Sequence, residues 1–451
     1  MQAEYKSKAE YLIIGLGATG LSVARYLAER GLRFSVADTR YNPPGLNEFT
    51  TSWPDASIWL GPLDAELTSR MSTLVVSPGI SVNEQAISAA RAAGVEVIGD
   101  VELFCREVST PILAVTGSNA KSTVTTLIGE MAAAAGKQVG VGGNIGLPVL
   151  DLLREGRKDL YVLELSSFQL ETTQSLTARG AVLLNISEDH LDRYVGMDEY
   201  ILAKQRIFHR CETAIFNRAD ALTVPIHGQN ARRLSFGLDH PTGESELGLA
   251  EHEGQTWLFR GDLPLMPTAE VPLAGDHGIS NALAAFALGF AAGLSVDAMR
   301  RAVVDFQSLP HRCQRLASRK GVVYYNDSKA TNVGATLAAV KGLKKPDSPL
   351  WLILGGEGKG QDFSPFKTAL QEGIGGVALI GRDAVMLAEQ LPESTQKQHC
   401  DSLARAVEWI ASRAKAGDQV LLSPACASFD QFRGFVHRGE VFTECVLNLP
   451  D

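Results

Sequence analysis

The sequence lacks the features that mark a zinc protein, a membrane-spanning protein or a nucleic-acid-binding protein. Its six cysteines form no C-x-x-C pair, which argues against a zinc site and is typical of a reducing compartment. The longest helix-like apolar stretch starts at Ala282 and has 13 residues, whereas a helix that spans a bilayer needs about 20. The formal net charge of −9 offers no electrostatic attraction to a nucleic acid.

The N-terminus also lacks the apolar core of a secretory signal peptide. Hydrophobic residues make up 45% of the chain and charged residues 21%, which is the balance of an ordinary soluble globular protein. A chain of 451 residues has room for several domains of about 100–200 residues each. We therefore expect a cytoplasmic, multidomain protein that neither enters a membrane nor binds nucleic acid.

Short apolar runs alternate with helix-like patterns along the chain, which predicts α/β domains with parallel sheets. Residues 1–98 have the order of a Rossmann-like domain. The pattern restarts at 99 and runs to 308, with strands that are apolar throughout, as expected for a parallel sheet covered on both faces. Residues 309–451 alternate again, as a doubly wound, Rossmann-like domain would. Within the central segment, residues 222–272 are expected to be irregular, with Gly, Pro and short β-like runs that decorate the sheet. A closing helix is expected from about Ser280.

The first loop, GLGATG, is a complete G-x-G-x-x-G between an expected strand and an expected helix. Its glycines are Gly15, Gly17 and Gly20, and Asp38 follows at the end of the next strand. This spacing is typical of a nucleotide-binding loop, in which glycines permit a tight turn and a helix N-terminus faces a phosphate. The loop would suit NAD or another diphosphate nucleotide, and a glycine-rich turn without a ligand is the simpler alternative.

A second candidate loop, TGSNAKST at 116–123, departs from the pattern G-x-x-x-x-G-K-[ST] because Val115 and Ala120 occupy its glycine positions. The apolar run ILAVT precedes it and an amphipathic helix follows it, as in a phosphate loop. Such a loop needs inward-pointing N–H groups, a lysine for the terminal phosphates and a hydroxyl for magnesium, which suit Lys121 and Ser122. We expect Ala120 to be right-handed or strained, because a Cβ disfavours positive φ.

The loop resembles the form T-G-[ST]-x-G-K-[ST] of the Mur ligase family, with Ala120 in place of a glycine. Further stretches resemble this family in the same order: GGNIG with Asn144, LELSSFQLE with Glu164, NISEDHLDRY with His190, EYILAKQRIF with Lys204, then LPHRCQ, NDSKATN and SPACASFDQF. The resemblance runs from about residue 11 to 440. The stretches DTR, PPGL, NDSKATN and SPACASFDQF are similar to those of members that join D-glutamate to UDP-N-acetylmuramoyl-L-alanine during peptidoglycan precursor synthesis.

The resemblance implies an ATP-dependent ligase that converts a carboxylate to an acyl phosphate, which the incoming amine then attacks. Phosphoryl transfer of this kind depends mainly on positioning and charge neutralisation. The implied catalytic residues are Lys121, Glu164, His190 and Lys204. The implied cofactors are ATP and two Mg²⁺ ions, held by Ser122, Glu164, His190 and a carbamate on Lys204, whose oxygens are ligands that suit Mg²⁺.

The resemblance also distributes three substrates over the three domains of an expected monomer. The implied ATP site comprises Gly117, Ser118, Asn119, Ala120, Lys121, Ser122, Thr123, Asn281, Arg312 and Asp327. The implied UDP-substrate site comprises Gly17, Ala18, Thr19, Asp38, Thr39, Arg40, Ser77, Gly79, Asn144 and His190. The implied D-glutamate site comprises Lys329, Thr331, Lys359, Ser428 and Phe435.

One stretch departs from the family, which carries H-N-x-x-N before the closing helix of the central domain. Here the stretch is GDHGISN, so Gly278 replaces the first asparagine, only Asn281 remains, and one contact near the adenine is in question. The alternatives are another Mur-type or a folylpolyglutamate-type ligase, a nicotinamide dehydrogenase that would use GLGATG alone, and a nucleotide sensor without activity. Taken singly, His190 also fits a core histidine and Lys204 a solvated helix lysine.

Overall fold

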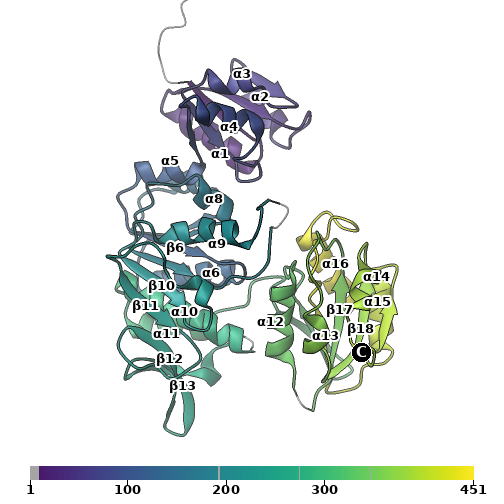
Figure 1. The fold of residues 1–451 in the computed structure, drawn as a ribbon. Helices are drawn as coiled ribbons and strands as arrows, with labels where there is room; N and C mark the ends of the chain where they lie inside the picture. The colour runs from purple at the N-terminus through teal and green to yellow at the C-terminus, as the bar shows by residue number, and fades with distance from the viewer. Residues whose placement is uncertain (1–9, 191–192, 274, 346, 451) are drawn as a thin grey trace, which may run out of the picture.

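The computed structural model describes residues 10–190, 193–273, 275–345 and 347–450. Residues 1–9, which carry the expectation of a missing signal peptide, lie outside these ranges. The strands form three sheets, one in each expected segment of the chain, and Figure 1 shows them as three separate units. The α/β class is confirmed, while the exact boundaries at 98/99 and 308/309 stay predictions.

The N-terminal sheet is entirely parallel, with the order β3-β2-β1-β4-β5. Its strands are β1 (Glu10–Ile14), β2 (Arg33–Asp38), β3 (Ile58–Leu60), β4 (Thr73–Val76) and β5 (Glu96–Ile98), and its helices are α1 (Ala18–Glu29), α2 (Leu46–Ser52), α3 (Ala65–Ser69) and α4 (Gln85–Ala92). The chain turns sharply after β1 at Gly15, whose φ is +99°. A Cβ on Gly15 would lie 2.8 Å from the Cβ of Ser77, so the GLGATG loop packs directly on the turn that follows β4.

The central sheet has nine strands in the order β14-β13-β12-β11-β10-β9-β6-β8-β7. Its parallel part comprises β6 (Ile112–Thr116), β7 (Val139–Gly143), β8 (Leu160–Glu164), β9 (Gly180–Leu183), β10 (Thr213–Asn217) and β11 (Arg232–Phe236). The α-helices of this segment are α5 (Asp100–Glu107), α6 (Lys121–Ala134), α7 (Val149–Leu152), α8 (Ser167–Glu171), α9 (Met197–Gln205), α10 (Gly275–Ala292) and α11 (Val296–Asp305), and its 3-10 turns are η1 (Leu153–Glu155), η2 (Arg206–Phe208), η3 (Ala221–Thr223) and η4 (Thr268–Glu270). Helices α6, α10 and α11 bury their apolar faces on the strands in one core.

Residues 222–272 carry the expected β-like runs, but these form regular strands of the central sheet rather than an irregular decoration of it. They contain β11 and then β12 (Glu246–His252), β13 (Gln255–Arg260) and β14 (Leu263–Pro267), which extend the central sheet. Strands β12 and β13 form an antiparallel hairpin whose two-residue turn, Glu253-Gly254, has positive φ at both positions. That backbone is favoured in two-residue hairpins, but Glu-Gly is a weaker sequence signal than Asn-Gly or Asp-Gly.

The C-terminal sheet has the order β15-β16-β20-β17-β18-β19, and it is parallel except for its edge strand β15. Its strands are β15 (Gln314–Arg319), β16 (Val322–Asn326), β17 (Leu350–Gly355), β18 (Ile374–Ile380), β19 (Lys397–His399) and β20 (Gln419–Leu422), and its helices are α12 (Val333–Leu343), α13 (Phe366–Ala369), α14 (Ala384–Glu389), α15 (Leu403–Ala411) and α16 (Phe435–Leu447). Helix α12 lies on the side of this unit that faces the central one (Figure 1).

The closing helix α10 begins at Gly275, earlier than expected, and packs against α12 of the C-terminal unit. Gly275 has a φ of +69°, and a Cβ there would lie 2.4 Å from the Cα of Gly342. The two glycines therefore let α10 and α12 approach closely. Across the described parts of the chain, we find no helix with the length and apolarity that a membrane crossing demands.

Candidate active site

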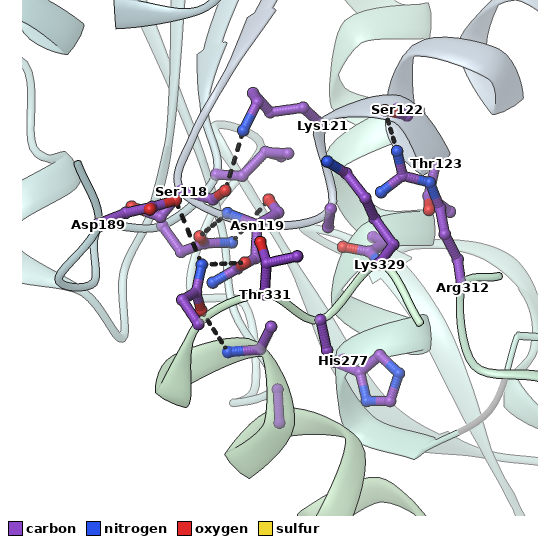
Figure 2. A pocket seen from close by; sticks show the side chains of 18 of the residues that line it. Ser118, Asn119, Lys121, Ser122, Thr123, Asp189, His277, Arg312, Lys329 and Thr331 are labelled. Carbon is purple, nitrogen blue, oxygen red and sulfur yellow. Dashed lines mark hydrogen bonds between the residues drawn. The ribbon is translucent and has the colours of Figure 1, made fainter. Parts of the chain in front are cut away.

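The candidate site lies at the carboxyl ends of three adjacent parallel strands, β9, β6 and β8. The phosphate loop (residues 116–123) follows β6, Glu164 ends β8, and the segment 184–190 follows β9. Ligands of open α/β sheets bind at this edge. A cavity of about 540 Å³ opens there between the central and C-terminal units, and Figure 2 shows side chains of both units pointing toward it.

The phosphate loop is held in shape by the segment that follows β9. The N–H groups of Ser118 and Asn119 donate to the backbone and side-chain oxygens of Asn185, at 2.9 Å and 2.8 Å. The Ser118 hydroxyl donates to the Ser187 carbonyl at 3.0 Å, and the Asn119 amide donates to the Ser187 hydroxyl at 3.1 Å. Lys121 begins α6 and folds back, so that its Nζ donates to the carbonyls of Gly117 and Ser118 at 2.8 Å and 2.9 Å. The loop is thus rigidly formed around its lysine.

Ala120 takes the strained of its two expected conformations. Its φ of 65° and ψ of 0° place it in the left-handed region, immediately before α6. The position therefore keeps the backbone that a glycine of the family pattern would favour, although it carries a Cβ. A left-handed residue other than glycine costs about 1–2 kcal/mol, which the hydrogen bonds of the loop offset.

Lys204 is a buried residue rather than a solvated helix lysine. Its exposed fraction is 2%, and its Nζ lies 4.8 Å from the centre of the Tyr200 ring. The same Nζ donates to the Gly117 carbonyl at 2.8 Å, which also accepts from Lys121. Burial and the neighbouring Lys121 charge hold the pKa of Lys204 well below its ordinary value. A lowered pKa favours the neutral, nucleophilic form of an amine.

Glu164 has one carboxylate oxygen engaged and one without a protein partner. Its Oε1 accepts from the Asn144 amide at 2.7 Å, while its Oε2 is buried and has no hydrogen bond. An unpaired buried carboxylate oxygen is costly unless a ligand completes it. Glu164 and the Ser122 hydroxyl line the same cavity, so oxygen donors that suit Mg²⁺ are present.

His190 lies at the rim of the cavity in a tight turn, with a φ of 56°. Its ring packs edge-on against Phe168 at 4.8 Å, and its Nε2 is 3.7 Å from a carboxylate oxygen of Asp189. The side chain is 43% exposed, which excludes the alternative of a core histidine. In the described residues, no three or more side chains of the His, Cys, Asp and Glu types cluster as a metal site, so the ligand set with Lys204 stays a prediction.

The C-terminal unit completes the cavity from the opposite side. The Arg312 guanidinium donates to the Ser122 hydroxyl at 2.6 Å. The Asn332 amide donates to Asn119 at 3.2 Å and to Asp189 at 3.3 Å. These contacts join the two units directly at the phosphate loop.

Basic groups outnumber acidic groups in the cavity. Its lining includes the bases Lys121, Lys204, Arg312, Lys329 and Lys359 and the acids Glu164, Asp189 and Asp327. Burial lowers the pKa of Lys121 and of Arg312, and burial together with Arg312 lowers the pKa of Lys329 to about 8. Burial also raises the pKa of Asp327 to about 7, which weakens the negative charge further. A cavity with this charge balance suits a polyanionic ligand.

Most residues of the implied ATP site meet in this cavity. Its lining contains Ser118, Asn119, Ala120, Lys121, Ser122, Thr123, Asn281, Arg312 and Asp327, together with Asn144, Glu164, His190, Lys204, Lys329, Thr331 and Lys359 from the other implied sets. Gly117 contributes its carbonyl to both lysines. Phe435 lies behind Lys329, whose Nζ is 4.4 Å from the ring centre, and the buried Ser428 follows the lining residue Ala427.

The implied UDP-substrate residues of the first domain lie away from this cavity, at the carboxyl ends of β1, β2 and β4. Gly17, Ala18 and Thr19 lead into α1, Thr39 and Arg40 follow β2, and Ser77 and Gly79 follow β4. Asp38 is fully buried, and its carboxylate accepts from the Leu16 N–H at 2.6 Å and from the Arg40 guanidinium at 2.7 Å. Its observed role is therefore to shape the GLGATG loop, and a contact with a nucleotide stays a prediction.

Gly278 lies in the first turn of α10, where the structure has no room for a side chain. A Cβ there would lie 2.6 Å from the Leu273 carbonyl oxygen. The neighbouring His277 carries a buried Nδ1 without a hydrogen-bond partner, and both residues line the cavity beside Asn281. An asparagine at 278 would require the backbone to shift, which accounts for the departure from the family pattern.

Sequence reasoning missed several residues that organise the site. Asn332, Ser187 and Tyr200 lie inside stretches that the sequence singles out, so only their individual contacts were not foreseeable. Arg438 is different, because it is fully buried and far along the chain. Its guanidinium donates to the backbone and hydroxyl oxygens of Ser328 and to the Cys426 carbonyl, which ties together the loops after β16 and β20. No sequence signal we used indicates a buried arginine there.

We expect Ala120→Gly to stabilise the protein by about 1 kcal/mol, because glycine adopts the left-handed conformation without steric cost. The matched control is Ala133→Gly in the exposed face of the same helix, α6, where the substitution should destabilise by about 1 kcal/mol. Urea unfolding of both variants measures the two free energies. Destabilisation by both substitutions would contradict the left-handed backbone at 120.

Comparison with known proteins matches most of the chain to one family. The family model of the Mur ligase MurD-like N-terminal domain matches residues 9–99, that of the Mur ligase middle domain matches residues 115–289, and that of the Mur ligase glutamate ligase domain matches residues 311–426. The UDP-N-acetylmuramoylalanine–D-glutamate ligase of Pseudomonas aeruginosa is 50% identical over 97% of this chain and 98% of its own. The enzyme of the same name from Marinobacter nauticus is 49% identical over 97% and 98% of the two chains.

Solved structures agree with the three-domain fold. The UDP-N-acetylmuramate-alanine ligase of Thermotoga maritima superposes with a TM-score of 0.62 at 16% identity, covering 98% of this chain and 99% of its own. The MurF ligase of the same organism, solved in complex with ADP, superposes with a TM-score of 0.63 at 15% identity, covering 97% and 94% of the two chains. On these domain matches and on the near-full-length identity to the curated relatives, the chain belongs to the Mur ligase family.

Proposed function

We propose that this ligase joins D-glutamate to UDP-N-acetylmuramoyl-L-alanine and converts ATP to ADP and phosphate. The names of the relatives that are 49–50% identical over nearly the full length support these two substrates. The observation that carries the proposal is the single cavity in which a phosphate loop on one side faces Lys329, Thr331 and Lys359 on the other. A dehydrogenase would have no use for this cavity, and a sensor would have no use for residues that face the phosphates from a third domain.

ATP would bind with its phosphates on the amides of the phosphate loop. Lys121 now donates to two carbonyls of its own loop, and a terminal phosphate would replace these weaker acceptors. Arg312 and Asp327 approach from the C-terminal unit, and Asn281, which lines the same cavity, would contact ATP near the adenine. Positioning of this kind, with charge neutralisation, supplies most of the rate enhancement in phosphoryl transfer.

The residues present suit two Mg²⁺ ions. Ser122 and Glu164 would hold one, and the unpartnered Oε2 of Glu164 is the observation that supports this assignment. His190 and a carbamate on Lys204 would hold the other. When bound, Mg²⁺ neutralises the phosphate oxygens and orients the carboxylate that receives the phosphoryl group.

The carbamate on Lys204 forms when the neutral amine attacks the carbon of CO₂, with one proton released to solvent. Burial lowers the pKa of Lys204 and so favours that neutral amine. The reaction replaces a neutral amine by an anion in a cavity that has an excess of basic groups, so the carbamate is attracted to the neighbouring Lys121. It supplies two oxygens, the ligand type that Mg²⁺ prefers.

The amino acid would bind in the C-terminal unit. Lys329 and Lys359 offer cations for its carboxylates, Thr331 and Ser428 offer hydroxyls, and Phe435 backs Lys329. The amine of D-glutamate attacks the acyl carbon, the new C–N bond forms, the C–O bond to phosphate breaks, and the amine loses a proton. Contacts such as Arg312 with Ser122 would hold the units closed, because water would otherwise hydrolyse the acyl phosphate.

The UDP part of the other substrate would bind at the carboxyl ends of the first sheet, through Gly17, Ala18, Thr19, Asp38, Thr39, Arg40, Ser77 and Gly79. Its muramoyl-alanine part would reach toward Asn144 and His190. Since Asn144 already donates to Glu164, it would link the substrate to the metal site.

An amino-acid panel tests the proposed function. With ATP, Mg²⁺ and UDP-N-acetylmuramoyl-L-alanine, we expect phosphate release with D-glutamate to exceed that with L-glutamate, L-lysine or meso-diaminopimelate by at least about 100-fold in kcat/KM, since a mismatched stereocentre leaves buried polar groups unpaired. Each reaction is followed by phosphate release and by mass of the product. Faster turnover with any of the other three amino acids would refute the assignment.

Replacement of Lys204 tests the carbamate. We expect Lys204→Ala to fold but to lose at least about 10³-fold in kcat, because an oxygen ligand is missing from the phosphoryl-transfer site. Acetate or formate should restore part of the activity by occupying the vacated position, and removal of CO₂ and bicarbonate should slow the unmodified enzyme. Lys137→Ala, in the same domain but outside the cavity lining, is the matched control. It should keep a normal kcat and should not respond to acetate or formate. Near-normal turnover of Lys204→Ala, or indifference to every small acid, would count against the carbamate.

A further inference from the structure

Arg193 spans the N-terminal and central units, and none of the roles above uses it. Its guanidinium lies over the Phe168 ring, 4.2 Å from the ring centre. Its Nη1 donates to the carbonyls of Pro78 and Gly79 at 3.4 Å each, and its Nη2 donates to the Ile80 carbonyl at 3.3 Å. Phe168 belongs to the central unit, while the three carbonyls belong to the turn after β4 in the N-terminal unit. One side chain therefore contacts both units.

Arg193 also contacts the tight turn at His190. The Arg193 N–H donates to the His190 carbonyl at 2.9 Å, and the His190 ring packs on the same Phe168. The left-handed φ of His190 makes the direction of its side chain depend on this turn. A displacement of Arg193 would therefore change the position of His190.

Arg193 donates hydrogen bonds to the 77–80 turn, and this turn packs on the GLGATG loop. Ser77 donates its hydroxyl to the Gly15 carbonyl at 3.1 Å, and the Ile80 N–H donates to the Ser77 carbonyl at 2.9 Å. Gly15 and Ser77 have no space between them for a further atom. A ligand on the GLGATG loop would thus fix the turn that Arg193 contacts.

The other end of the same segment is fastened to the phosphate loop. Ser187 exchanges hydrogen bonds with Ser118, and the Ser187 hydroxyl accepts from Asn119. Asp189 accepts from Asn332 of the C-terminal unit. Ser187 is therefore anchored to the ATP loop, and Arg193, a few residues further along the chain, is anchored to the N-terminal unit.

We propose that Arg193 is a positioning residue that couples occupancy of the UDP-substrate loop to the placement of His190 and to ATP binding. This inference rests on the proposed function, because it assigns the GLGATG loop to the UDP-substrate. Thermodynamic linkage makes the coupling reciprocal, so ATP should strengthen binding of the UDP-substrate by the same factor as the UDP-substrate strengthens binding of ATP.

Arginine suits this role better than lysine. Its planar guanidinium can stack on Phe168 and donate in several directions at once to the three carbonyls. Lysine offers a compact ammonium without a stacking face. Methionine keeps much of the length and the apolar contact with Phe168 but has no donor for the carbonyls.

Calorimetry on the full chain tests the coupling. UDP-N-acetylmuramoyl-L-alanine is titrated with and without a non-hydrolysable ATP analogue and Mg²⁺. In the unmodified enzyme we expect the analogue to tighten binding at least about fivefold, the lower end of ordinary coupling between sites. In Arg193→Met we expect this ratio to fall close to one, while each ligand alone still binds with an affinity within about threefold of normal. Arg193→Lys should give an intermediate ratio.

A matched control is Arg413→Met, which removes another arginine that stacks on an aromatic ring and donates to a carbonyl, but within the C-terminal unit only. It should leave the ratio unchanged. An unchanged ratio in Arg193→Met, or no coupling in the unmodified enzyme, would overturn the coupling role and leave the proposed function intact. Failure of the unmodified enzyme to bind the UDP-substrate at all would instead overturn the proposed function and this inference with it. If Arg193→Met does not fold, the ratio in Arg193→Lys decides, and a normal value there overturns the proposal.

Discussion

The excess of buried positive charge around the phosphate loop is the constraint on which the rest of the site depends. Lys121 and Lys204 both donate to the Gly117 carbonyl, and the charge of Lys121 helps to lower the pKa of Lys204. Arg312 and Lys329 add further cations from the C-terminal unit, and burial lowers the pKa of each of these four groups. The basic groups of such a site outnumber its acidic groups, and a polyanion would provide the missing negative charge. This excess of basic groups accounts for both the proposed triphosphate ligand and the proposed carbamate, because each adds negative charge beside the phosphate loop.

Because the basic groups and the other proposed binding residues come from different units, the three units must act together. No single unit contains all the residues proposed to bind the substrates. The central unit supplies the phosphate loop and Glu164, the C-terminal unit supplies Arg312 and Lys329, and the N-terminal unit supplies the GLGATG loop. The hydrogen bonds from Arg312 and Asn332 to the phosphate loop hold two units together where the charges converge. Closure would exclude water, which strengthens every electrostatic interaction inside.

Much of this arrangement could be predicted from the sequence, because motifs at strand ends report directly on parallel sheets. The strand before the phosphate loop, the helix after it and the place of Glu164 follow from apolar runs and their length. The regular strands β12–β14 could not be predicted, because their Glu253-Gly254 turn is a weak sequence signal. For Ala120, the sequence left two backbone conformations open, right-handed or strained, and the structure has the strained, left-handed one. Contacts between distant segments, such as Arg193 with the 77–80 turn or Arg438 with Ser328, depend on tertiary packing that periodicity does not encode.

The central claim is that the substrate carboxylate is activated as an acyl phosphate within this cationic cavity. The most direct test uses UDP-N-acetylmuramoyl-L-alanine labelled with ¹⁸O in both oxygens of its alanine carboxylate, incubated with ATP, Mg²⁺ and D-glutamate. If the carboxylate takes the phosphoryl group, one labelled oxygen leaves with it, so the account predicts one ¹⁸O in each phosphate released, measured by mass spectrometry. Phosphate without the label, formed at the same rate as the amide product, would contradict the account.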